Sequence, residues 1–271
     1  MKPLLLIVGA GYLGSEISRQ AQGYRTVTVT KSGEDADEAC DLSFANEVAT
    51  LAARHPHPNI VVHCASSGRG GAEAYRNVFI KGSENLVRYF AQSQLMLTSS
   101  TSVYHQTDGS DVDESSQTFP IRETSQLLIQ AEKIILQSGG TVARLAGLYG
   151  PGRSVILRKF LEGTAVIEED GRRILNQIHV EDAASAILHL ASLDKGGLFN
   201  VTDDHPLSQL ECYQGLAEHF QRPLPPVGKK NTTRKRAWTH KAVLNTLIRR
   251  SGWEPRFPSF FDAIDQLSET S

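Results

Sequence analysis

The sequence contains little that would mark a specialised class of protein. Three cysteines occur among 271 residues, and Cys40, Cys64 and Cys212 are scattered without a Cys-x-x-Cys spacing. An odd, scattered set of thiols argues against a disulfide framework and against a structural zinc site. We therefore expect no bound metal, a reducing compartment, and cysteines that act as small buried apolar side chains.

Long apolar runs and a charge imbalance are also missing. Hydrophobic residues make up 40% of the chain, but no apolar run approaches the roughly twenty residues that a membrane span needs. The formal net charge of −2 gives no reason to expect nucleic acid or an anionic membrane surface as a partner. The first residues lead straight into an apolar strand, which argues against a signal peptide. We expect a cytoplasmic protein whose partner is a small-molecule substrate.

A glycine-rich turn follows an apolar run near the start of the chain. Leu4–Val8 has no polar residue, which predicts a buried parallel strand. In the Gly-x-Gly-x-x-Gly spacing that follows, Gly9 permits the turn, Gly11 lets backbone approach a pyrophosphate, and Gly14 allows helix and strand to pack closely. The first N–H groups of the next helix would face the phosphates. This stretch predicts dinucleotide binding.

The next apolar and β-branched run suggests which dinucleotide is bound. Residues 26–30 predict a second strand, whose tip meets the adenosine ribose in a Rossmann unit. An acidic residue there would suit the free 2′-hydroxyl of NAD, but the chain has Thr30, Lys31 and Ser32. Lysine and hydroxyl groups suit a 2′-phosphate, so we expect NADP in preference to NAD. The alternative is that Lys31 is a solvated loop charge.

Strands and helices alternate through the first half of the chain. Alternation of this kind predicts a Rossmann fold, an α/β doubly wound parallel sheet whose strand ends lie along one edge. The further elements expected are strands at 59–64, 95–99 and 141–145, a short segment ending at Asp41-Leu42, and helices over 44–54, 72–93 and 124–137.

Small and hydroxyl side chains follow two of the predicted strands. Ala65 and Ser66 come after the strand at 59–64, and residues 100–104 come after the strand at 95–99. The carboxyl ends of these strands would pass beneath the nicotinamide half of a cofactor. The polar, aperiodic stretch 105–120 predicts a surface loop near this site and a candidate lid.

Beyond Gly150-Pro151-Gly152 the pattern loosens and proline becomes more frequent. We predict a dinucleotide-binding core over 1–150 and a smaller C-terminal substrate lobe mostly over 151–271, with 176–201 returning to the core. The positive run at 229–236 predicts a solvated face, with a clamp for phosphate or carboxylate as the alternative. Shorter elements are expected as helices at 154–161, 181–193 and 208–220 and a strand at 198–201.

Several separated motifs occur in a recognisable order. They are Gly9–Gly14, Asp41-Leu42, Val62–Ala65, Thr98–Tyr104, Arg144–Arg153, Ile178–Ala184 and Phe199–Thr202. Together they resemble the extended short-chain dehydrogenases/reductases, also called the NAD-dependent epimerase/dehydratase family, and they cover most of the chain. The resemblance implies a Rossmann core with a smaller C-terminal substrate lobe.

The resemblance also implies roles for individual residues. Asp41 and Leu42 would contact adenine, and Asn77 would be the helix asparagine near the site. Ser100 would lie beside the reacting carbonyl because it stands four residues before Tyr104, and Ser99 and Thr101 are its nearest rivals. The expected cofactor-binding residues are Gly9, Gly11, Tyr12, Leu13, Gly14, Thr30, Lys31, Ser32, Asp41, Leu42, Ala65, Ser66 and Ser99.

One part of the family pattern is missing. The family's chemistry needs tyrosine and lysine spaced as Tyr-x-x-x-Lys on one helix, where the lysine and the cofactor ribose lower the pKa of the tyrosine. Thr124 and Leu128 stand at these positions, so the ordinary proton relay cannot operate. The chain therefore resembles an atypical member. Tyr104 and Tyr149 are the expected replacements, and the other candidates are His105, Glu123 and His179.

Two hypotheses about function follow, and they leave open whether the protein is an enzyme. The first is an NAD(P)-dependent oxidoreductase or epimerase-like enzyme that acts on a small carbonyl, alcohol or sugar-type substrate, with Ser100 as the group that polarises the carbonyl. The alternative is a non-catalytic NAD(P)(H)-binding redox sensor or scaffold. By analogy with the family, the helices predicted at 72–93 and 124–137 would form a homodimer face.

Overall fold

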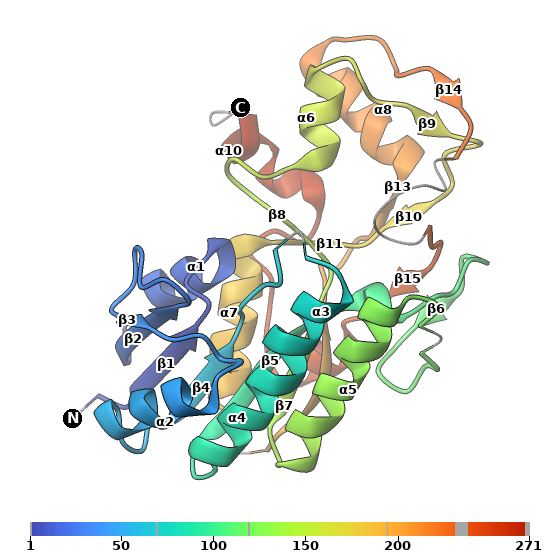
Figure 1. Cartoon of the computed structure of the whole chain (residues 1–271). Helices are drawn as coiled ribbons and strands as arrows, with labels where there is room; N and C mark the ends of the chain where they lie inside the picture. The colour runs from blue at the N-terminus through green and yellow to red at the C-terminus, as the bar shows by residue number, and fades with distance from the viewer. Residues whose placement is uncertain (1, 69, 119, 194, 231–237, 269–271) are drawn as a thin grey trace. The chain divides into compact units, whose positions relative to one another are not determined.

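The computed structural model describes the chain except residues 1, 69, 119, 194, 231–237 and 269–271 (Figure 1). Residues 231–236 of the predicted positive run therefore lie outside the described part. The chain forms two compact units of three segments each. The first unit comprises Met1–Val103, Pro120–Arg144 and Ala184–Phe199, and the second comprises Tyr104–Phe119, Leu145–Ala183 and Asn200–Ser271.

A seven-stranded sheet of order β12-β7-β5-β4-β1-β2-β3 organises the first unit. Strand β1 pairs in parallel with β2 and β4, β2 pairs in parallel with β3, and β4 with β5. Helices cover both faces of this sheet (Figure 1). The predicted α/β Rossmann fold is therefore confirmed. The strands are β1 (Leu4–Val8), β2 (Arg25–Thr30), β3 (Glu38–Ala39), β4 (Ile60–His63), β5 (Gln94–Ser100), β7 (Thr141–Leu145) and β12 (Gly197–Val201).

The strand order reverses beside β1. The chain runs outward from β1 through β2 to β3, and it then returns to β4 on the other side of β1. Ligands of open α/β sheets bind at the carboxyl ends of the strands at such a point. Every residue of β1 and β4 is buried, because helices cover both faces of a parallel sheet.

The helices of the alternating pattern lie close to their predicted positions. Their apolar residues recur at helical spacing, which explains why the sequence locates them. In the first half they are α1 (Tyr12–Gln20), α2 (Ala45–Arg54) and α5 (Glu123–Gln137), and further along they are α6 (Val155–Leu161), α7 (Val180–Ala191) and α8 (Gln209–Phe220).

The helix predicted over 72–93 differs in its interior and in its end. It consists of α3 (Ala72–Tyr75), a π-helical segment η1 (Arg76–Lys81) and α4 (Gly82–Tyr89). Phe90 is the C-cap residue of α4, so the helix ends before Ser93. A π segment changes the hydrogen-bond spacing without altering the composition, and periodicity therefore does not reveal it.

The second unit is built from short paired strands and short helices. The stretch 105–120 is not an irregular loop throughout, because β6 (Asp111–Val112) pairs in parallel with β15 (Ala242–Val243) and Val112 is buried. This pairing joins residues about 130 positions apart, so local pattern could not predict it. The other pairs are β8 (Gly147–Tyr149) with β11 (Gln177–His179), β9 (Ile167–Glu168) with β14 (Val227–Gly228), and β10 (Ile174–Leu175) with β13 (Leu207–Ser208).

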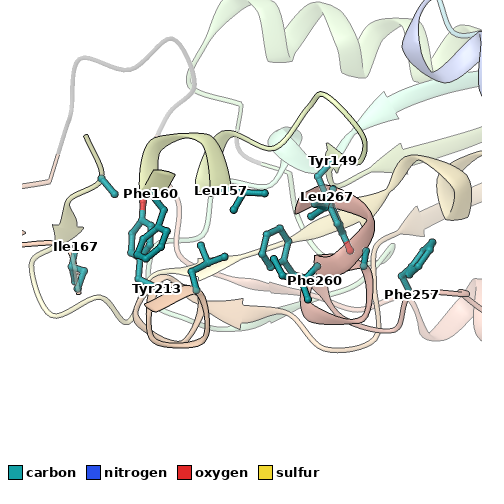
Figure 2. Close-up of a cluster of buried hydrophobic side chains, with 12 residues drawn as sticks. Tyr149, Leu157, Phe160, Ile167, Tyr213, Phe257, Phe260 and Leu267 are labelled. Carbon is teal, nitrogen blue, oxygen red and sulfur yellow. The ribbon is translucent and has the colours of Figure 1, made fainter. Parts of the chain in front are cut away.

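An aromatic-rich core holds the second unit together (Figure 2). The rings of Phe160 and Tyr213 stack with centroids 6.3 Å apart, which joins α6 to α8. The ring of Phe260 lies 5.2 Å from that of Tyr149. Phe260 belongs to the C-terminal part of the chain, whose helices are α9 (Thr246–Arg250), η3 (Phe260–Ala263) and α10 (Ile264–Ser268). Burial of large aromatic side chains is the main source of stability in such a small core.

The three cysteines are free thiols. Cys40 and Cys212 are buried as expected, whereas Cys64 is only partly buried. Burial raises the pKa of Cys40 to about 11 and those of Cys64 and Cys212 to about 12. These thiols therefore stay protonated at neutral pH and are poor nucleophiles.

Candidate functional site

The three glycines after β1 differ in what surrounds them. Gly9 has a φ of +106°, and a Cβ added there would lie 2.3 Å from the backbone nitrogen of Ala65. A Cβ on Gly14 would lie 2.1 Å from the carbonyl oxygen of Gly9, whereas a Cβ on Gly11 would meet nothing within 4 Å. The fold itself therefore requires Gly9 and Gly14. Gly11 leaves open space at the strand end, as close approach of a ligand would need.

Helix α1 begins at this open position. Gly11 is its N-cap residue, and no side chain caps the first turn. Leu13 is buried, while Tyr12 is partly exposed. The first N–H groups and the positive end of the helix dipole are suited to a phosphate group. The local geometry thus fits the pyrophosphate of a dinucleotide.

The end of β2 carries an ion pair. Lys31 Nζ lies 2.8 Å from Asp41 Oδ2, and the Lys31 side chain is 82% exposed. The hydrogen bond to Asp41 raises the pKa of Lys31. Burial acts to raise the pKa of Asp41, but bonds from Lys31 and Ser43 outweigh it, so the pKa of this carboxyl group is lowered. Thr30 Oγ1 donates to the carbonyl oxygen of Glu34, and Ser32 Oγ accepts from the Glu34 N–H.

Strand β4 ends at a buried histidine, and a short turn follows the strand. Ser66 Oγ accepts a hydrogen bond from the N–H of Gly68. His63 is buried, and its Nε2 lies 3.0 Å from the carbonyl oxygen of Val78 in the π-helical segment. Burial lowers the pKa of His63 to about 4, so the imidazole is neutral. His63 therefore ties β4 to η1, the segment that also contains Asn77.

A buried polar network lies at the end of β5. Ser99 Oγ donates to Glu132 Oε1 at 2.5 Å, and Arg144 donates to the same carboxylate through Nε at 3.0 Å and Nη2 at 2.7 Å. All three residues are buried. The Ser99 hydroxyl is thus committed to Glu132, on helix α5. Through these charge-assisted hydrogen bonds, Arg144 joins strand β7 to helix α5.

Ser100 is the next residue of the strand and is only partly buried. Its Oγ accepts from the N–H of Ser102 at 3.2 Å. Successive side chains of a strand point to opposite faces, so Ser100 is directed away from the Ser99 network. On α5, Thr124 and Leu128 share a face with Glu132 because they are spaced by four residues. Leu128 is buried, and it offers no polar group there.

The predicted proton-transfer residues of the second unit are core side chains. Tyr104 is buried, and its hydroxyl donates to Asn200 Oδ1 at 2.9 Å. The Tyr149 hydroxyl donates to the Ser259 carbonyl oxygen, and burial together with Asp203 and Asp182 raises its pKa. His179 is fully buried between the rings of Tyr149 and Phe257, at 5.2 and 4.3 Å. This environment stabilises the neutral phenol, and a catalytic role for either tyrosine stays a prediction.

The described residues contain no cluster of three or more histidine, cysteine, aspartate or glutamate side chains suited to a metal ion. Within the same residues, no helix is both long and apolar enough to cross a membrane. What the first unit does bring together is the glycine turn, the tip of β2 and the ends of β4 and β5. The Ser99–Glu132–Arg144 network is the part of this region that sequence reasoning did not assemble.

Comparisons with known proteins agree with this arrangement. A model of the "NAD dependent epimerase/dehydratase family" matches residues 5–202. Protein YeeZ of Escherichia coli K12 is 28% identical over 213 residues, which cover 72% of this chain and 76% of that protein. Sterol-4-alpha-carboxylate 3-dehydrogenase erg26 of Schizosaccharomyces pombe is 25% identical over 227 residues, covering 70% and 64% of the two chains.

Solved structures share the fold. The UDP-glucose 4-epimerase of Thermotoga maritima, solved with UDP-glucose, has a TM-score of 0.82 at 18% identity and covers 98% of both chains. The UDP-glucose 4-epimerase of Thermus thermophilus, solved with NAD, has a TM-score of 0.81 at 17% identity, again over 98% of both chains. The family match spans most of the sequence, including the glycine turn and the ends of β4 and β5. This chain belongs to the NAD-dependent epimerase/dehydratase family.

Proposed function

We propose that this protein is an atypical NAD(P)-dependent oxidoreductase or epimerase-like enzyme that acts on a small carbonyl or alcohol, including sugar-type substrates. The observation that carries the proposal is the contrast among the three glycines. The backbone of the protein itself fills the space beside Gly9 and Gly14, whereas the space beside Gly11 is open at the uncapped start of α1. A dinucleotide pyrophosphate fits that combination.

The related proteins support the choice of cofactor and substrate class. The Thermus thermophilus enzyme was solved with NAD, the Thermotoga maritima enzyme with UDP-glucose, and the Schizosaccharomyces pombe relative is named a dehydrogenase. A nicotinamide ring supplies or accepts a hydride when it is bound. Ser100 would donate a hydrogen bond to the substrate oxygen, and Tyr104 and Tyr149 remain the predicted groups for proton transfer.

The direct test is calorimetric titration of the purified protein with NADPH and NADH, followed by a carbonyl-reduction panel that monitors absorbance of the reduced cofactor. We expect saturable binding and turnover of at least one substrate. If the protein binds neither NADPH nor NADH, the proposal is excluded. A panel that includes nucleotide-linked sugars and simple aldehydes and ketones would separate the substrate classes.

Ser100→Ala should lower turnover by about 100-fold, the effect typical of losing one hydrogen bond to a developing oxyanion. Cofactor affinity should stay unchanged, because the Ser100 hydroxyl has only a local contact with the Ser102 N–H. The measurement is kcat with the best substrate from the panel, alongside the dissociation constant for NADPH. Ser102→Ala, at an exposed neighbouring position, is the matched control. Equal turnover in wild type and Ser100→Ala would remove Ser100 from the mechanism.

We also propose that NADP is preferred to NAD, because Lys31 carries its charge at the exposed tip of β2. Lys31→Ala should weaken NADPH binding by about tenfold and leave NADH binding unchanged. Paired titrations with both dinucleotides measure this difference, and Lys2→Ala removes an exposed lysine elsewhere as a control. A similar loss for both dinucleotides would show that Lys31 does not recognise the 2′-phosphate.

The second candidate function is a redox sensor or scaffold that binds the dinucleotide without catalysis. It is favoured by Thr124 and Leu128, which cannot reproduce the family's proton relay. A sensor should bind a partner protein with different affinities in the presence of NADPH and NADP+. Robust carbonyl reduction would argue against this function.

A homodimer built on the helix comprising α3, η1 and α4 together with α5, and a cytoplasmic location, complete the proposal. The dimer rests on analogy with the family, and light scattering after size-exclusion chromatography tests it. The cytoplasmic location is supported by the three cysteines, which are free thiols.

A further inference from the structure

The segment that joins β3 to α2, residues 40–44, lies beside the tip of β2. Asp41 in this segment forms the 2.8 Å ion pair with Lys31, which follows β2 directly. In a Rossmann unit the tip of this strand meets the adenosine half of a dinucleotide. Residues 40–44 are therefore next to the place where the proposed function puts the adenosine.

One backbone donor of this segment has no acceptor. The N–H of Leu42 makes no hydrogen bond within the described part of the chain, although Leu42 is only 5% exposed. The N–H groups of the other four residues all donate, at 2.7–3.0 Å. Their acceptors are the Thr30 carbonyl oxygen for Cys40, Glu47 Oε2 for Asp41, and oxygens of Asp41 for Ser43 and Phe44. An unpaired N–H in so covered a residue is uncommon, and it is available to a ligand.

The carbonyl group of Leu42 is held from a distant helix. Asn85 in α4 donates from Nδ2 to the Leu42 carbonyl oxygen at 2.7 Å. The side chain of Leu42 is buried at the same time. Because the carbonyl carbon, the side chain and the N–H group are all attached to one Cα atom, fixing the first two restricts the direction of the third.

The same helix makes room for the Leu42 side chain at Gly82. This glycine is buried, and its φ of −59° is an ordinary helical value that any residue adopts. A Cβ added there would lie 3.2 Å from Leu42 Cβ and 3.3 Å from Leu42 Cδ1, closer than side chains normally approach. The position therefore requires glycine for space and not for backbone conformation. Gly82 and Asn85 are three residues apart, so they share one face of α4.

We infer that Gly82 and Asn85 are positioning residues for cofactor binding, which hold Leu42 so that its N–H donates to the adenosine half of the dinucleotide. Both act through Leu42 and not by touching the cofactor. The inference rests on the proposed function, because it requires a dinucleotide on the glycine turn. A backbone donor held in this way gives orientation to a bound ligand.

The test is calorimetric titration of the full chain with NADPH, with ADP-ribose, and with reduced nicotinamide mononucleotide, which lacks the adenosine. Asn85→Leu removes the amide donor with little change in size. It should weaken the binding of NADPH and ADP-ribose by about fivefold to tenfold, the effect of losing one well-formed hydrogen bond. The affinity for reduced nicotinamide mononucleotide should stay unchanged. A merely structural role for Asn85 would not produce this division between the two halves of the cofactor.

Gly82→Ala tests the same arrangement by a second route that keeps the Asn85 amide. The added methyl group should displace Leu42 by a few tenths of an ångström and weaken ADP-ribose binding by about threefold or more. The Tm should not fall much, because alanine favours a helix more than glycine does. Asn46→Leu is the matched control, at an exposed asparagine of α2, and it should bind all three probes like wild type.

The outcomes separate this inference from the proposed function. If the wild type binds no dinucleotide, both are overturned together. If the wild type binds NADPH and ADP-ribose and both variants bind them equally well, only the role of Gly82 and Asn85 is overturned. An equal loss of affinity for ADP-ribose and for reduced nicotinamide mononucleotide would also overturn it, because the effect would not be confined to the adenosine half.

Discussion

Replacing Gly11 with alanine should abolish dinucleotide binding while leaving the melting temperature unchanged. A methyl group at this position meets no atom of the protein within 4 Å, and the φ of −82° is accessible to alanine. The same methyl group would occupy the space through which a pyrophosphate approaches the backbone. We expect the dissociation constant for NADPH to rise by at least about 100-fold, equivalent to about 2.7 kcal/mol. Calorimetric titration and thermal denaturation measure the two effects.

The neighbouring glycine provides the matched control. Gly14→Ala would place a methyl group 2.1 Å from the carbonyl oxygen of Gly9, so helix and strand would have to separate. This variant should lose about 3 kcal/mol or more of stability, through overpacking. Of these two variants, we therefore expect only Gly11→Ala to lose dinucleotide binding while it keeps the stability of the wild type. Tight NADPH binding by Gly11→Ala would show that the cofactor does not lie on this turn.

Arg144→Met should cost about 3–5 kcal/mol of folding free energy, because it leaves the Glu132 carboxylate buried without its bidentate partner. For a chain of this size the Tm should fall by about 6–20 °C. Urea denaturation followed by circular dichroism measures the change. As a control, Arg158→Met removes the basic partner of the exposed pair with Glu162. This variant should lose less than about 1 kcal/mol of folding free energy.

A double variant distinguishes two causes of the instability: loss of the attraction between Arg144 and Glu132, and burial of an unpaired Glu132 carboxylate. Glu132→Leu combined with Arg144→Met removes both charges, so it should recover much of the stability lost in the single variant. Ser99 would then lose its acceptor, a smaller penalty of about 1 kcal/mol. If the double variant were as unstable as Arg144→Met alone, the buried carboxylate would not be the cause.

The elements that the sequence locates well are those whose residues interact with near neighbours or lie between two covered faces. Leu4–Val8 is apolar throughout because both sides of β1 are buried, and α5 is found because its apolar residues recur at helical spacing. The glycine turn can also be predicted from local sequence, because the spacing of its three glycines indicates the steric role of each. This is why the family resemblance emerges from sequence.

Long-range pairing is what the sequence does not reveal. Val112 looks like part of a polar loop until β15, far along the chain, supplies its partner. Ser99 and Ser100 are indistinguishable by composition, and only Glu132 on another element shows that Ser99 faces inward. The same holds for Lys241, which is buried although its neighbours in the chain do not predict this.

The two units share the polypeptide in an interleaved manner, and the chain passes from one to the other five times. No single cut can therefore yield both units as independent fragments. A fragment ending at residue 150 would lack β12 and the whole of α7, and the open edge of β7 would invite pairing with other chains. Replacement of one unit by another would therefore require three separate segments of the chain to change together.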